Sequence, residues 1–154
     1  MRTLLLLSIC ILFQGTAIAQ KVMRLDSART KGLGTAHMDS LYVSGLDAQD
    51  STKAAFTGPA EEFVEQFHQT LQAIGAHLSK AGFRWGEDTR VLYRMFFAAD
   101  GSVEHFHYQV RQSISPEHEQ ELQRALEDFM GQYRFPLKAS VPYKQCGTAL
   151  FKDK

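Results

Sequence analysis

Cysteine is scarce in this sequence, which contains only Cys10 and Cys146 among its 154 residues. Cys10 lies in an amino-terminal segment that we expect to be removed, and one remaining cysteine cannot form an intramolecular disulfide. The mature domain must therefore be held together by a hydrophobic core and not by cross-links. The remaining alternative for Cys146 is an intermolecular disulfide.

Excess charge of either sign is also missing, because 17 Lys and Arg residues balance 17 Asp and Glu residues. A near-neutral chain has no excess of basic residues to attract nucleic-acid phosphates, so we expect no nucleic-acid partner. The sequence has no glycine-rich phosphate loop, no nucleophile elbow, no Cys-x-x-Cys pair and no repeat. We therefore expect no cofactor and assign no catalytic residue.

Only one apolar run is long, and it stands at the amino end. Arg2 precedes the run 4–13, which has about ten residues, as in a secretory signal, where a spanning helix needs about 20. The small-x-small triplet Ala17-Ile18-Ala19 predicts cleavage directly after it. We expect a signal peptide at 1–19, a periplasmic or secreted location in a bacterial envelope, and no stable membrane insertion after cleavage. An uncleaved anchor is the alternative.

The next segment, residues 20–58, shows no sustained hydrophobic period and is rich in turn-forming residues. This composition predicts a flexible leader. Within it, Leu41-Tyr42-Val43 is either a short strand or a loop with a few anchoring side chains.

Two amphipathic helices are predicted in the remainder, residues 59–154, which we interpret as a single α+β domain. The first covers about 59–81 and is followed by Gly82, a residue suited to the left-handed helix cap. The second begins with Ser115 as its N-cap and cannot continue through Pro136. The two apolar stripes are Phe63, Phe67, Leu71, Ile74 and Leu78, and then Leu122, Ala125, Leu126, Phe129, Met130 and Tyr133.

Between the helices, two alternating runs at 89–98 and 102–111 flank Asp100-Gly101, a pair typical of hairpin turns. The period of two selects one face of this hairpin for the core. The residues on that face are Val91, Tyr93, Met95, Phe97, Phe106, Tyr108 and Val110.

A last extended run, 139–151, contains Pro142, which predicts an edge strand at least at its start. The predicted order is α-β-β-α-β, a small antiparallel sheet with both helices packed on one face.

Three motifs recur in this part of the chain as they do in a known family: Asp100-Gly101 in the turn, Tyr133-Arg134-Phe135-Pro136 at the end of the helix, and Val141-Pro142-Tyr143 opening the last strand. With these motifs, residues 85–151 resemble the TonB C-terminal domain family. Energy transducers of that family keep a membrane anchor and a long proline-rich spacer. We find neither feature in the sequence after residue 19, so the resemblance does not imply energy transduction.

What the resemblance implies is a fold and a mode of binding, in which an extended segment adds to the final strand through main-chain hydrogen bonds. The residues we assign to this peptide-binding edge strand are Val141, Tyr143 and Gln145. The expected partner is a peptide or protein segment, or a second copy of the chain. The preferred function is thus a non-enzymatic accessory or binding module.

The alternative is a small envelope hydrolase or a metal-dependent enzyme. His105 and His107 are two residues apart on a strand, so both imidazoles project to one face, where they can bind a metal together. Two ligands are too few for a zinc site, and His118 or Glu119 would help only from the same face. A solvated histidine pair is the competing interpretation. Cys146, followed by Gly147, is the other candidate, as a thiol nucleophile, but no protease motif surrounds it.

Overall fold

The computed structural model of the protein describes residues 21–47 and 50–153, so the predicted signal peptide lies outside the described residues. The elements follow one another as β1 (Val22–Arg24), α1 (Leu25–Thr30), α2 (Thr35–Leu41), β2 (Val43–Ser44), the 3-10 turn η1 (Ser51–Lys53), α3 (Ala60–Lys80), β3 (Thr89–Phe97), β4 (Val103–Val110), α4 (Pro116–Gln132) and β5 (Tyr143–Phe151).

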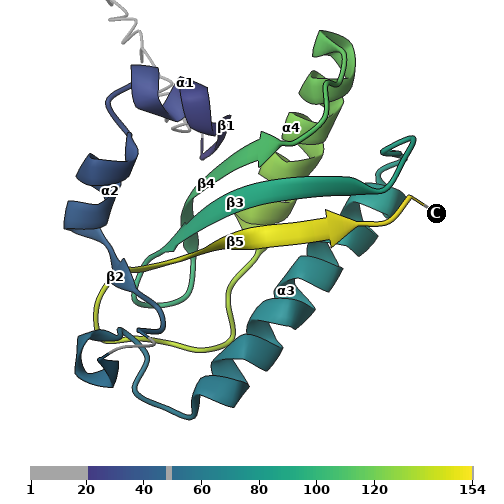
Figure 1. Cartoon of the computed structure of the whole chain (residues 1–154). Coiled ribbons are helices and arrows are strands. Elements are labelled where there is room, and N and C mark those ends of the chain that lie inside the picture. The colour runs from purple at the N-terminus through teal and green to yellow at the C-terminus, as the bar shows by residue number, and fades with distance from the viewer. Residues whose placement is uncertain (1–20, 48–49, 154) are drawn as a thin grey trace, which may run out of the picture.

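The five strands form one sheet in the order β1-β4-β3-β5-β2 (Figure 1). β3 pairs antiparallel with both of its neighbours, β4 and β5. The outer strands β1 and β2 instead run parallel to β4 and β5. The α+β class is therefore confirmed, whereas the prediction of a purely antiparallel sheet is wrong.

The main core lies between the sheet and the two long helices. α3 and α4 turn their predicted stripes inward, where Phe63, Phe67, Ile74, Leu78, Leu122, Leu126, Phe129 and Met130 are all buried. The seven predicted hairpin residues are buried against them. Ser115 caps α4 by accepting a hydrogen bond from the His118 N–H, as its position predicted.

The turn between β3 and β4 depends on a glycine. Gly101 has a φ of +85°, and a Cβ atom there would collide with the Phe135 carbonyl oxygen. The Phe135 N–H in turn donates to the Gly101 carbonyl at 2.8 Å. The Asp-Gly pair thus forms the turn and also docks the segment that follows α4.

The prediction of a flexible leader is wrong for the described part of residues 20–58. This segment contributes both outer strands and the helices α1 and α2, and its side chains Val22, Met23, Ala28 and Met38 are buried. Its elements are only two to seven residues long, so no hydrophobic period can develop within them. The segment predicted as a strand or loop at 41–43 is also too short to show a period, because the strand there has only two residues and starts at Val43.

The leader also changes the layering of the fold. Phe96 alternates with Met95 and Phe97 along β3, so it faces away from the main core, where Met38 and Tyr42 pack on it. In Figure 1, α1 and α2 lie at the left of the sheet, away from α3. Helices therefore cover both faces of the sheet, and the prediction of one covered face is wrong.

Candidate functional site

The first part of β5 is not an edge, because β2 covers it. The carbonyls of Pro142 and Lys144 accept hydrogen bonds from the N–H groups of Val43 and Gly45, at 3.3 and 2.8 Å. After Gly45 the chain turns away from β5. The prediction of an edge at the start of this strand, based on Pro142, is therefore wrong.

The remainder of β5 has no neighbouring strand on its outer side among the described residues. Backbone groups alternate in direction along a strand, and those of Pro142 and Lys144 point outward. The same alternation directs the N–H and C=O groups of Cys146, Thr148 and Leu150 outward, with β2 no longer beside them. This outward row, defined by Cys146, Thr148 and Leu150, is called the open edge below.

The three residues predicted for peptide binding do not lie on the open edge. Val141 precedes the strand and is 40% exposed, whereas Tyr143 is buried, 1% exposed, and packs in the main core. Gln145 pairs with Met95 and directs its backbone toward β3. The predicted residues therefore lie before the strand, in the core beside β2, or with the backbone turned toward β3, and the open edge of β5 begins after them.

One sequence signal would have located the open edge. Exposed edges are usually protected by charged residues or proline. Pro142 and Lys144 stand where β2 already covers the strand, and the seven residues 145–151 contain neither a charge nor a proline. The part of β5 without a neighbour is thus also the part without protection.

A groove of about 650 Å³ runs between the open edge and α3. One wall is a stripe of α3 side chains, and the other is the carboxyl-terminal half of β5. Figure 1 shows α3 slanting upward below the yellow strand β5, toward the carboxyl-terminal end of the strand. The residues of the helical wall are His68, Leu71, Gln72, Gly75, Ala76, Leu78 and Ser79.

Small residues line both walls of the groove. Gly75 and Ala76 stand on the helix, and Ala149 stands on the strand. Gly147 precedes it on the same face, and a Cβ atom there would lie 2.6 Å from the Tyr93 hydroxyl oxygen. The Tyr93 side chain therefore covers Gly147, whereas Ala76 and Ala149 line the groove with small side chains.

Aromatic rings close one end of the groove. Trp85 stacks on Phe151 with ring centroids 5.4 Å apart, and it meets Phe83 edge-on at 4.9 Å. The backbone N–H of Trp85 donates to the Asp153 carboxylate at 2.9 Å, which holds residue 153 against this corner. Arg84 and Lys152 line the same end with exposed side chains.

The histidine pair projects to one face as predicted, but that face is not solvated there. His107 is 1% exposed, and its ring centroid lies 5.0 Å from that of Phe96 and 5.8 Å from that of His105. Burial, reinforced by His105 and Arg94, lowers the pKa of His107 to about 4. The pKa of His105 is lowered too, mainly by burial. Neither the His107 Nε2 nor the buried His105 Nδ1 has a hydrogen-bond partner within the described ranges.

These histidines gain no third metal ligand. In residues 21–47 and 50–153, no three His, Cys, Asp or Glu side chains converge as a metal site. His118 stacks on Phe83, and Glu119 binds Arg24 and Tyr108, both on the main-core side of the sheet. Within the described residues, the histidine pair therefore lacks the third ligand that a zinc site would need.

Cys146 lies far from the histidine pair. It is exposed and stands opposite Arg94 on β3, which in turn stands opposite His107 on β4. Two strand spacings, about 10 Å, therefore separate the backbones of the cysteine and the histidine. A thiol and an imidazole so placed do not form a nucleophile–base pair.

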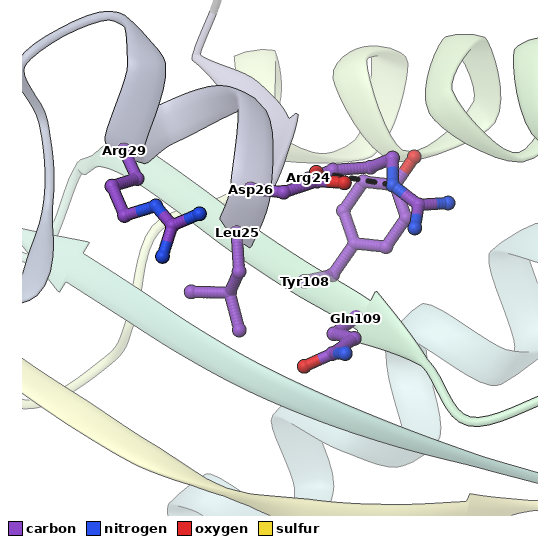
Figure 2. A pocket seen from close by; sticks show the side chains of 6 residues that line it. All are labelled: Arg24, Leu25, Asp26, Arg29, Tyr108 and Gln109. Carbon is purple, nitrogen blue, oxygen red and sulfur yellow. Dashed lines mark hydrogen bonds and ion pairs between the residues drawn. The ribbon is translucent and has the colours of Figure 1, made fainter.

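A second, smaller cavity of about 260 Å³ lies between α1 and β4 (Figure 2). Figure 2 shows Leu25 and Arg29 reaching down from α1 beside Gln109. Arg24, at its rim, bonds both carboxylate oxygens of Glu119, at 2.8 and 2.9 Å, and also Asp26. The Arg24 charge is thus already paired, and this cluster ties β1 to α4.

No protein-family model, curated protein or solved structure matches the chain. None of the helices in the described part is long and apolar enough to cross a bilayer.

Proposed function

We propose that this protein is an exported, non-enzymatic binding module that captures an extended peptide segment of another protein in the groove between α3 and β5. The observation that carries the proposal is the open edge, three residues whose backbone groups point outward beside a helical wall. An added strand would bond there through its main chain, and its side chains would contact α3. The resemblance to the TonB C-terminal domain family implies the same mode of binding.

The groove fits a single strand better than a rigid body. α3 stands beside the edge, so a partner must enter the slot between helix and strand. β2 already occupies the equivalent position next to Tyr143 and Lys144. A captured segment would therefore pair with β5 on the same side as β2, beginning where the pairing with β2 ends.

The first experiment is hydrogen exchange on the full chain with peptides selected from a displayed random library. We expect the amides of Cys146, Thr148 and Leu150 to exchange at least about tenfold more slowly in the complex, because a bound strand protects them. The amides of Gly147 and Ala149 bond β3 in both states and serve as an internal reference. Peptides that bind and leave the three outward amides unprotected would contradict strand addition.

Substitutions provide the second test. Thr148→Pro removes one outward donor while the adjacent bonds to β3 remain, and Leu150→Lys places a charge on the edge. Both variants should weaken the selected peptides by at least about tenfold. Val64→Lys is the matched control, since Val64 is 43% exposed and does not line the groove. Equal binding by all three variants would overturn the proposal.

A further inference from the structure

The groove also indicates which peptide it takes, an inference that rests on the function proposed above. We infer that the captured segment directs one bulky apolar side chain, aromatic or long aliphatic, toward α3, and carries an acidic residue toward Arg84 and Lys152. The first half of this inference comes from the shape of the groove, and the second from its charges.

The shape follows from the alternation of side chains on an added strand. Every second side chain of that strand would face α3, in line with Gly147 and Ala149 of β5. Ala76 on the helix and Ala149 on the strand line the groove with small side chains, whereas the Tyr93 hydroxyl covers Gly147 and the Phe151 ring packs against Gly75. Protein interiors are close-packed, and a large side chain from the partner would complete the packing.

The apolar character of this space comes from its surroundings. Leu71 and the ring of Phe151 lie on either side of the small residues, and the Phe151 ring reaches α3, 3.6 Å from the Cβ position of Gly75. The neighbouring Leu78 is buried beneath. An aromatic or long aliphatic side chain would meet carbon atoms on three sides.

The charges of the groove stand at its aromatic end. Arg84 donates to the carbonyl oxygens of Ser79 and Phe83, so its charge meets no carboxylate in these bonds. Lys152 lines the same end. The Asp153 carboxylate there accepts the backbone N–H of Trp85. Asp88, beside the groove, accepts the Asp153 N–H at 3.2 Å, so both carboxylates near this end are engaged by main-chain donors. Among the residues that line the groove, the two cations outnumber the one carboxylate, which favours an acidic side chain on the partner.

A second copy of this chain meets these requirements poorly. If its β5 paired with the open edge, the side chains facing α3 would be Gly147 and Ala149 in the middle of the strand, and the bulky ring of Phe151 only at its end, beside Lys152. Lys144 and Lys152 flank that strand and would bring further positive charge to the groove. The occupant is therefore a segment of a different protein.

The test uses the full chain and the fluorescent peptide acetyl-Thr-Glu-Thr-Phe-Thr-Glu-Thr-amide, in which Phe and both Glu residues share one face. Replacing Phe by Ala should weaken binding by about tenfold or more, as expected for an aromatic ring that leaves an apolar site. Replacing both Glu residues by Lys should weaken it severalfold, with a smaller effect at high salt. Equal affinity of the three peptides would overturn the inference.

A variant of the groove supplies the reciprocal test. Ala76→Leu fills the space from an exposed helical position and should abolish the preference for Phe over Ala. Gln69→Leu, on the same helix but outside the groove, should keep it. If library-selected peptides protect the outward amides but show no preference for a bulky residue, strand capture stands and this inference fails. If no peptide protects those amides, the proposed function itself fails.

Discussion

Gly147 is fixed by a contact across the sheet. Its backbone lies under the Tyr93 hydroxyl, which a Cβ atom would approach to 2.6 Å. We predict that Gly147→Ala lowers the free energy of unfolding by about 1 to 3 kcal/mol, the usual cost of overpacking. Tyr93→Phe removes the oxygen and should recover part of the loss in the double variant, measured by urea unfolding as a double-mutant cycle. Additive losses would show that the hydroxyl is not the obstacle.

His107 makes stability depend on pH. Its pKa of about 4 in the folded protein lies below the ordinary value of 6.5, because burial, His105 and Arg94 disfavour the charged form. The stabilisation is complete above pH 6.5 and is lost as the pH falls toward 4, since only the unfolded chain binds the proton in that range. Between pH 7.5 and 5 the loss should be about 2 kcal/mol.

The substitution His107→Leu tests this assignment, because leucine keeps an apolar side chain against Phe96 without a titrating group. The variant should lose about 2 kcal/mol less than the natural chain over the same pH interval, as measured by urea unfolding. An unchanged pH dependence would assign the effect to other groups.

At the scale of the element, β1 is short, but its side chains are buried and bonded to the rest of the fold. Val22 and Met23 are 0% and 4% exposed, and Arg24 bonds Glu119. A chain beginning at Leu25 should therefore unfold about 3 to 6 kcal/mol more easily than one beginning at Gln20, because it loses two buried apolar side chains. Urea unfolding of the two chains measures the difference, and coincident curves would contradict it.

The elements that the sequence predicted are those long enough to show a period. The stripe from Phe63 to Leu78 and the alternation from Val91 to Val110 each repeat several times, so helix and hairpin were predictable. β2 consists of Val43 and Ser44 alone, and its pairing with β5 joins residues far apart in the sequence. Nothing local encodes such a pairing, and the location of the open edge depends on it.

At the scale of the whole molecule, the position of β1 limits where the amino end can be cut. Cleavage after Ala19 leaves Val22 intact, whereas a cut three or more residues further along would remove it. We predict that the chain produced in a Gram-negative bacterium is recovered from the soluble envelope fraction with Gln20 as its first residue. Intact mass and amino-terminal sequencing test this. Full-length protein in the membrane fraction would instead support an uncleaved anchor.

The two parallel outer strands also set the order in which the chain can fold during synthesis. β1 and β2 emerge first from the ribosome, yet β1 pairs with β4, and β2 pairs with β5, the last strand of all. Such contacts between distant residues form slowly and only after the intervening chain exists. The sheet therefore stays incomplete until synthesis is nearly finished, and the growing chain would stay unfolded, as the proposed export through a translocation channel requires.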